Sequence, residues 1–457
     1  MKNLTKKDLL FIGLMLFSLF FGAGNLIFPP FMGEAAGNKT WIVLLGFSIT
    51  AVGFPVLGVI AVAKSGGLTN LAKRVNPIFA TIFTILIYVS IGPGLGIPRA
   101  GSLPFEMAVA PYLSENISLR IALFIYTLIF FAISYWLSLS PNKLVDRMGK
   151  VLTPALLLLI LVMVIGSFMK PLGEYGVAVN GYETSSFFKG FLDGYLTMDT
   201  IAALNFGIVI AVAIRSKGVN DDKKVVSLSI KAGVIAGIIL AVIYAMLAHL
   251  GATSGGRFGV TENGAQTLTN ITTYIFGKPG AILLALIFTL ACLTTCVGLI
   301  TSCSQYFSTL TKKISYENWV RLLTVFSMII ANMGLTKILS ISEPILNAIY
   351  PIAIMLIVLS MFNSIFKDNK YIYGLTILFT GIVSIIDAIG QMGLAKESLV
   401  KLISYLPLYK EGLAWIVPAI LGIILGLIIK LIKENSFINE NAFQGERWLG
   451  LKVNIYI

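Results

Sequence analysis

A short stretch near the start of the chain, GAGNLIFPP at residues 22–30, combines glycine, asparagine and proline in a way that interrupts a helix. Pro29 and Pro30 have no N–H groups, so carbonyls of the preceding turn lack helical donors. Glycine lowers the cost of leaving helical geometry. The free carbonyls, the amide of Asn25 and two oppositely polarised helix ends predict a site for a small charged solute. The alternative is that the glycines only permit close packing and the prolines only kink the helix.

A second stretch, FLDGYLTMDTIAALNFG at residues 191–207, also places polar residues in an apolar run. Asp199 lies deep in this run, where an unpaired charge is costly. It therefore has to face a wet cavity, a cation or a structural partner such as Arg99. For Asp193 a functional role and a place at the membrane surface are both open.

A third stretch, LACLTTCVGLITSCSQ at residues 290–305, is rich in hydroxyl groups. Hard cations such as sodium bind oxygen ligands, although hydroxyls in membrane helices often bond to their own turn. The hydroxyl residues are Thr294, Thr295, Thr301 and Ser302. The cysteines are Cys292, Cys296 and Cys303. With no histidine nearby and none of these cysteines in an outer loop, we interpret them as small packing residues rather than metal ligands or disulfide partners.

These stretches lie in a strongly apolar chain. Its 457 residues are 57% hydrophobic and 12% charged, with a mean hydropathy of +0.90. This composition predicts an all-α polytopic membrane protein embedded in a lipid bilayer, and we expect no nucleic-acid partner despite the net charge of +13. About twelve apolar runs have the length of a membrane span. They cover roughly residues 8–30, 41–63, 78–106, 119–138, 150–169, 187–214, 225–251, 280–310, 318–335, 342–366, 371–391 and 412–432.

The basic residues are distributed unevenly between the two sides of these spans. With the N-terminus inside, 23 of the 34 lysines and arginines fall on the inner loops and tails and 10 on the outer loops, while Arg99 lies within the third span. Inner loops of membrane proteins carry this excess of positive charge. We therefore predict that both termini are cytoplasmic.

The two interrupted spans are five spans apart. Because five is odd, the second unit crosses the membrane in the direction opposite to the first, as in transporters built from inverted repeats. We predict a first repeat at residues 1–170, broken near 22–25, and a second at 187–366, broken near 193–199. Two peripheral helices at 371–433 and a cytoplasmic tail at 434–457 follow.

The motifs DLLFIGLMLFSLFFGAGNLIFPP, FLDGYLTMDTIAALNFGIVIA and LTTCVGLITSCSQYF resemble the branched-chain amino acid:cation symporters of bacteria, the system II carriers for leucine, isoleucine and valine. The likeness extends from the first span through the twelfth. It implies membership of the amino acid–polyamine–cation superfamily, with the five-plus-five inverted repeat of the sodium-coupled leucine transporter type. It also implies residence in the bacterial cell membrane, and it leaves the oligomeric state open.

The resemblance implies a substrate site and a cation site. Gly22, Ala23, Gly24 and Asn25 match the GxGN segment of neurotransmitter:sodium symporters, whose main-chain N–H groups bind the substrate carboxylate. A sodium ion, with a proton or lithium as alternatives, is expected at the carbonyls of Ser18, Phe21 and Ala291 and the hydroxyls of Thr294 and Thr295. No organic cofactor is expected.

The sixth span departs from the symporter pattern because it reads LTMD, and this places a second sodium beside the substrate in doubt. Asp199 is instead available to the substrate ammonium, with Thr197 next to it. Aromatic and sulfur side chains are candidate walls of an apolar side-chain pocket. They are Phe20, Phe21, Tyr195 and Met198.

Other functions remain to be weighed against this interpretation. A polyamine carrier or a carrier of another amino acid in the same superfamily is the nearest alternative. A cation channel is a further alternative, but the sequence has no recognisable filter repeat. An intramembrane enzyme would need Asp193 and Asp199 as a pair, but the six-residue spacing points them in different directions on an unbroken helix, and no nucleophile motif accompanies them. We therefore do not expect an enzyme. The roles of Arg99, Asp193 and His249 stay open.

Overall fold

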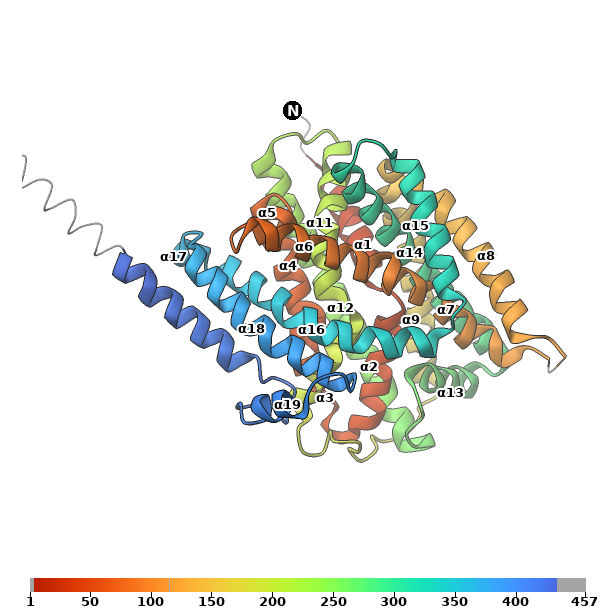
Figure 1. Ribbon diagram of the computed structural model, residues 1–457. Helices are drawn as coiled ribbons and strands as arrows, with labels where there is room; N and C mark the ends of the chain where they lie inside the picture. Colours follow the sequence, from red (N-terminus) through yellow and green to blue (C-terminus); the bar gives the residue numbers. More distant parts are fainter. Residues whose placement is uncertain (1–3, 115, 434–457) are drawn as a thin grey trace, which may run out of the picture.

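The computed structural model describes residues 4–114 and 116–433, and these form a bundle of helices (Figure 1). The first part of the bundle comprises α1 (Lys6–Phe20), α2 (Ala23–Ala36), η1 (Gly37–Lys39), α3 (Thr40–Ser48), η2 (Ile49–Gly53), α4 (Phe54–Ser65), α5 (Leu68–Lys73), α6 (Pro77–Val89), η3 (Ser90–Gly94), α7 (Gly96–Ala108), η4 (Ala110–Tyr112), α8 (Leu119–Ser138), η5 (Pro141–Lys143), η6 (Val145–Leu152) and α9 (Thr153–Met169). The second part comprises α10 (Ser186–Asp193), η7 (Gly194–Thr197), α11 (Asp199–Ser216), α12 (Asp222–Phe258), α13 (Gly264–Phe276), α14 (Lys278–Leu310), α15 (Tyr316–Ala331), α16 (Leu335–Met361), α17 (Asn363–Phe366), α18 (Lys370–Gln391), α19 (Glu397–Ser404) and a last helix, Ile416–Lys433. The predicted tail at 434–457 lies outside the described residues.

Among the described residues, 10 helical segments are long and apolar enough to cross a membrane. Two of the predicted spans coincide with shorter helices. The first predicted span is divided into the 15-residue α1 and the 14-residue α2, and the ninth corresponds to the 16-residue α15. The described part of the structure therefore has 10 such segments instead of the twelve predicted, because one predicted span is interrupted and another is a short helix.

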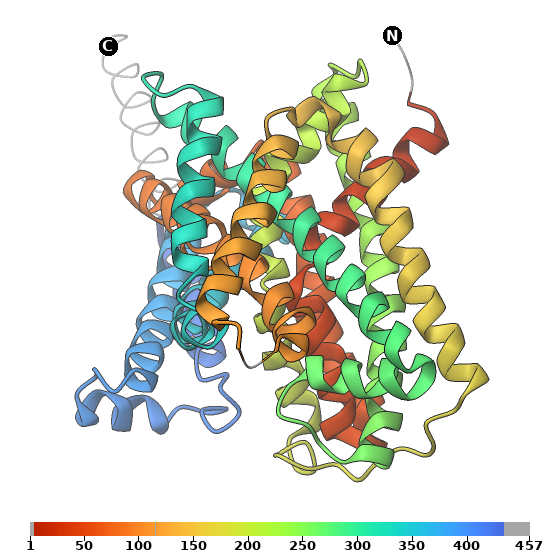
Figure 2. The same ribbon diagram turned by 90° about the vertical axis from the view of Figure 1, so that its right-hand side faces the viewer.

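The bundle has two ends, which we name by their position in Figure 1. The upper face carries α5 and α17, and the lower face carries α13 and α19. Figure 2, turned by 90°, shows α13 lying across the lower end of the bundle rather than along it. This orientation is consistent with its length of 13 residues, too short to span a bilayer.

The lower half of the bundle is held by a seam in which α2 packs directly against α12 and α13. A Cβ atom placed on Gly33 would lie 2.0 Å from the carbonyl oxygen of Ala248, and one on Gly251 would lie 1.8 Å from that of Pro30. Gly264, at the start of α13, is equally close to the carbonyl of Ile27. Small residues let helix backbones approach in this way inside membranes. We refer to these contacts as the α2 seam.

The last two long helices lie at one edge of the molecule (Figure 1). α18 packs against α16, and the last helix packs on α18 where Gly422 and Gly426 face the backbone at Thr376 and Ile372. In the last helix, only 22% of the apolar stretch that could cross a membrane is buried inside the bundle. In the segment that contains α10 and α11, the corresponding share is 78%. The site-bearing helices are therefore central and the last helix is peripheral.

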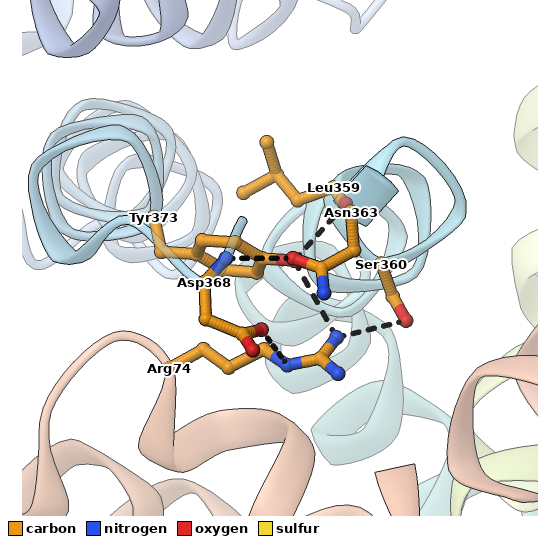
Figure 3. Close-up of polar contacts among 6 residues, drawn as sticks. All are labelled: Arg74, Leu359, Ser360, Asn363, Asp368 and Tyr373. Atoms are coloured by element: carbon orange, nitrogen blue, oxygen red, sulfur yellow. Dashed lines mark hydrogen bonds and ion pairs between the residues drawn. The ribbon is translucent and has the colours of Figure 1, made fainter. Parts of the chain in front are cut away.

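A polar cluster at the upper face ties α5 to this edge (Figure 3). Arg74, just after α5, forms an ion pair with Asp368 at 2.7 Å and donates to the hydroxyl of Ser360 at 3.2 Å. Its Nη1 also lies 3.4 Å from the hydroxyl of Tyr373, which in turn donates to the side chain of Asn363. We call these residues the Arg74 cluster.

The three cysteines are free and buried within α14. Cys303 donates to the carbonyl of Tyr88 at 3.4 Å. No group of three or more metal-ligating histidine, cysteine, aspartate or glutamate side chains occurs in the described part of the chain.

Candidate functional site

The first interruption is a two-residue break in the middle of a membrane span. α1 ends at Phe20, Phe21 and Gly22 leave helical geometry, and α2 begins at Ala23. The N–H group of Gly22 donates to the side-chain oxygen of Asn25 at 3.0 Å, so Asn25 caps the new helix. The prolines do not themselves cause the helix interruption, because both lie inside α2, after its first turn.

The second interruption faces the first. α10 ends at Asp193, a short 3-10 turn follows, and Met198 adopts the left-handed backbone conformation with φ of 68°. α11 then starts at Asp199. A left-handed non-glycine residue stores strain that the surrounding structure must hold. Here it directs the carboxyl group of Asp199 back toward the first interruption.

Three side chains join the two interruptions in a closed triangle. The amide nitrogen of Asn25 donates to Oδ2 of Asp199 at 2.6 Å and also contacts the hydroxyl of Tyr244. Tyr244, from α12, donates to the same Oδ2 at 2.9 Å. All three side chains are at least 99% buried. The structure thus provides Asp199 with polar partners, and the sequence had not indicated Tyr244.

The predicted cation ligands lie where α14 passes the end of α1. The hydroxyl of Thr295 donates to the carbonyl of Ser18 at 3.3 Å, and a Cβ on Gly22 would lie 2.7 Å from that hydroxyl. Thr294 donates to the carbonyl of Ala291 on its own helix at 2.9 Å. The structure therefore brings Ser18 and Thr295 together across two helices and pairs Ala291 with Thr294 within one. These carbonyl and hydroxyl oxygens are ligands of the kind that hard cations bind.

A small cavity of about 30 Å³ lies between the two interruptions. Its lining includes many of the predicted substrate residues, namely Gly22, Ala23, Gly24, Asn25, Thr197, Met198 and Asp199, together with Thr295 and the predicted wall Phe20. Leu19, Ile91, Ala202 and Leu299 give it an apolar side, and Arg99 adds a guanidinium group. This volume has room for only a few water molecules. We call it the central cavity.

Two predicted wall residues point elsewhere. Tyr195 stacks on Tyr350 with ring centroids 4.4 Å apart and lines a separate cavity of about 300 Å³ near Trp415. Phe21 stacks on Phe17 and is fully buried. The 3-10 turn rotates Tyr195 away, and hydropathy alone does not reveal such a rotation.

A larger cavity of about 730 Å³ lies above the central cavity and reaches the upper face, where exposed Lys64 and Arg215 line it. α11 and α14 contribute to both cavities. Between them the carbonyl of Asn205 accepts from Ser302 at 2.9 Å and from Tyr88 at 3.4 Å. The side-chain amide of Asn205 is fully buried and has no hydrogen-bond partner among the described residues. These groups separate the central cavity from the upper cavity.

Asp193 and His249, which the sequence also singled out, have local partners. Asp193 accepts from Tyr182 at 2.6 Å, and burial together with this nearby carboxylate raises the pKa of the Tyr182 phenol well above its ordinary value. His249 contacts the hydroxyl of Tyr175 at 2.7 Å. Asp193 and His249 therefore do not line the central cavity.

The fold and the paired interruptions define the class of this protein. It is a multi-pass α-helical membrane transporter with discontinuous helices. The chain belongs to the family described as branched-chain amino acid transport protein, which it matches over residues 5–433.

Named relatives cover nearly the whole chain. It is 46% identical to the branched-chain amino acid permease BraB of Bacillus subtilis (strain 168), over 96% of this chain and 99% of that protein. It is 41% identical to the branched-chain amino acid transport system 2 carrier protein of Pseudomonas aeruginosa, over 94% and 97%. It is 36% identical to the permease BrnQ of Escherichia coli (strain K12), over 93% and 96%. The predicted family is thereby confirmed.

A solved structure shares the fold. Mhp1, a nucleobase-cation-symport-1 family transporter in a closed conformation with bromovinylhydantoin bound, superposes with a TM-score of 0.55 at 15% identity, covering 93% of each chain. At this identity the likeness concerns the fold alone. It confirms the predicted fold class, an all-α polytopic membrane protein of the sodium-coupled leucine transporter type. The boundaries of the two repeats stay a prediction.

Proposed function

We propose that this chain imports leucine, isoleucine and valine across the bacterial cell membrane by symport with sodium. The observation that carries the proposal is the hydrogen bond between Asn25 and Asp199, which joins two broken helices beside a cavity with one polar and one apolar side. Helix interruptions at membrane depth are tolerated where they line such a cavity. The family of the chain supports the branched-chain substrate.

The polar side of the central cavity recognises the amino acid backbone that all three substrates share. The apolar side, with Phe20, Met198 and Leu299 among its residues, accepts an aliphatic side chain. One methylene changes binding by only about 1–3 kcal/mol, so leucine, isoleucine and valine should compete with one another. A charged side chain would lose its hydration there and should be rejected.

Sodium is proposed to bind where Thr295 meets Ser18. Its ligands would be the carbonyls of Ser18, Phe21 and Ala291 and the hydroxyls of Thr294 and Thr295. A cation at this point attaches the end of α1 to α14 and so links ion binding to the position of the first interruption. Protons and lithium are the alternative coupling ions.

Alternating access is the proposed transport cycle. The central cavity has room for only a few water molecules, and the larger cavity lies on the upper-face side of it. Substrate entry then requires the helices around the central cavity to move apart, first on one side and then on the other. The upper face carries α5 and α17, whose neighbouring loops belong to the set that holds 23 of the 34 basic residues. We therefore assign the upper face to the cytoplasm.

Uptake into proteoliposomes tests this proposal. We expect labelled leucine to accumulate under an inward sodium gradient, and isoleucine and valine to compete while lysine and glutamate do not. Accumulation under a proton gradient without sodium would show that protons, and not sodium, are the coupling ion. Preferred uptake of an amine or another amino acid would favour the nearest alternative carrier, and a sodium current independent of leucine would favour a channel.

A further inference from the structure

One charged group in the central cavity has no assigned role. Arg99, in α7, is 3% exposed, and its Nη1 donates to the carbonyl of Leu196 at 2.9 Å. Its guanidinium also lies over the ring of Phe28, 5.2 Å from the centroid. The remaining nitrogens, Nε and Nη2, are buried and have no hydrogen-bond partner among the described residues. Leaving charged donors unpaired in a buried site is costly, so this arrangement needs a further partner.

The unpaired edge of Arg99 faces the place where the two interruptions meet. A Cβ atom on Gly24 would lie 2.6 Å from Nη2 and 3.0 Å from the carbonyl of Leu196. Arg99 and Asp199 both line the central cavity, yet no ion pair within 4.0 Å joins Arg99 to a carboxylate in the described part of the chain. The cavity therefore presents one guanidinium and one carboxyl group that do not neutralise each other by direct contact.

These two groups match the two charges of an amino acid. Nε and Nη2 lie on one edge of the guanidinium plane, and such an edge binds both oxygens of a carboxylate in parallel. We propose that this edge of Arg99 binds the α-carboxylate of the substrate while Asp199 binds its α-ammonium. The inference rests on the proposed function and deepens it. The main-chain N–H groups at the start of α2 then supplement Arg99 rather than act alone.

A purely structural role accounts for only part of the geometry. Arg147 makes the same two contacts outside the central cavity, since its Nη1 donates to the carbonyl of Leu137 at 3.0 Å and its guanidinium lies 5.0 Å from the centroid of the Trp136 ring. Those contacts are sufficient for an arginine that anchors a turn, and neither Nε nor Nη2 of Arg147 is a buried unpartnered atom. Arg147 is therefore a matched control for the loss of an arginine with this pair of contacts.

The test uses the full-length protein and a truncated substrate, isopentylamine, which is leucine without its carboxylate. Affinities are measured by competition against labelled leucine in detergent with sodium, for the wild type and for Arg99→Gln, Arg99→Lys and Arg147→Gln. For each protein the ratio of the leucine affinity to the isopentylamine affinity is compared, because this ratio does not depend on the fraction of active protein.

We expect Arg99→Gln to lower the affinity for leucine at least about tenfold while leaving that for isopentylamine nearly unchanged, so that the ratio collapses. Arg99→Lys, which keeps the charge but not the two-nitrogen edge, should fall between the wild type and Arg99→Gln, and Arg147→Gln should retain the wild-type ratio. If Arg99→Gln is not recovered folded, the ratio in Arg99→Lys decides.

Two different failures can be told apart. An unchanged ratio in both Arg99 variants, or an equal loss for both ligands, would overturn the role of Arg99 while leaving the proposed function in place. A wild-type protein that binds no branched-chain amino acid would overturn the proposed function and this inference with it.

Discussion

The side-chain amide of Asn25 and the carboxyl group of Asp199, 174 residues apart in the sequence, meet in a hydrogen bond of 2.6 Å. Tyr244 bonds to both partners, so the contact belongs to a triangle that α2, α11 and α12 share. The two helix interruptions are therefore joined directly by buried hydrogen bonds.

Substitutions at Asn25 should strongly reduce uptake. Asn25→Ala removes the cap on Gly22 and the donor to Asp199, and Asn25→Asp places a second carboxyl group against the first, where like charges repel. We expect initial rates of leucine uptake in proteoliposomes to fall at least about tenfold for both. Asn347→Ala, which removes an amide that bonds to Gln391 outside the central cavity, serves as the control. Uptake by Asn25→Asp at the control rate would refute the role of the triangle.

Thr295→Ala should raise the sodium concentration that gives half-maximal uptake. The substitution removes the hydroxyl that reaches the carbonyl of Ser18, while the triangle and its hydrogen bonds stay intact. The measurement is leucine uptake against sodium concentration at fixed ionic strength. Thr289→Ala on the same helix loses only a contact with Tyr126 and should behave as the wild type. Identical sodium curves for the two variants would contradict the assignment.

Gly24→Ala should prevent the two interruptions from meeting. The added Cβ would lie 2.6 Å from Nη2 of Arg99 and 3.1 Å from Cα of Thr197, and the latter cannot move away as a flexible side chain can. We expect loss of leucine binding, measured by equilibrium competition, with the protein still folded. Gly374→Ala is the comparison, because no heavy atom from another helix lies within 4 Å of the added Cβ at that position. Full binding by Gly24→Ala would show that this contact is not needed.

Glu34 should hold the start of α13 against α2. Its Oε2 accepts from the N–H and the hydroxyl of Thr261, at 3.0 and 2.6 Å, and from the hydroxyl of Thr267 at 2.9 Å. Glu34→Ala removes the acceptor of the Thr261 N–H, while the two hydroxyls keep the carbonyl of Asn263 at 3.0 and 3.3 Å, so we expect a loss of roughly 1–3 kcal/mol in local stability. We expect faster amide hydrogen exchange in residues 261–267. Glu262→Ala, at an exposed neighbouring position, should leave the exchange rates as they are.

The Arg74 cluster should stabilise the upper face without taking part in transport. Arg74 is only 17% exposed and bonds to three side chains, so Arg74→Gln should lower the midpoint of thermal unfolding measurably. Asp368 is 60% exposed, where an ion pair is worth at most about 1 kcal/mol, so Asp368→Asn should have the smaller effect. Melting curves in detergent measure both. A larger loss for Asp368→Asn would mean that the ion pair, rather than the buried hydrogen bonds, carries the stability.

The hydropathy of the sequence and the polar interruptions in its apolar runs predicted much of this architecture. A membrane helix must satisfy its own backbone, so glycine and polar residues at mid-depth, such as those around Asn25 and Asp199, stand out from lipid-facing sequence. The odd number of spans between them favours two units that cross the membrane in opposite directions, and the resemblance of the motifs to a known family implied the fold class. Positive charge on the inner loops adds an orientation, which stays a prediction.

The side-chain environment was less accessible from the sequence. Tyr244 lies in an apolar span, where a tyrosine is an ordinary packing residue, and only its place opposite Asp199 gives it a role. Glu34 lies just past the expected end of the first span and carried no signal. Tyr195 was expected to line the substrate pocket, but its direction depends on the rotation of a four-residue 3-10 turn. Such rotations are set by tertiary packing, which a linear pattern does not encode.

The α2 seam has a mechanical consequence for the carrier. Main-chain atoms of α2 touch those of α12 and α13 with no side chains between them, so this half of the broken span cannot slide without losing contacts along its length. The non-helical residues Phe21 and Gly22 separate it from α1. Release toward the upper face should therefore depend on bending at these two residues, with the lower half-helix acting as the fixed support about which α1 turns.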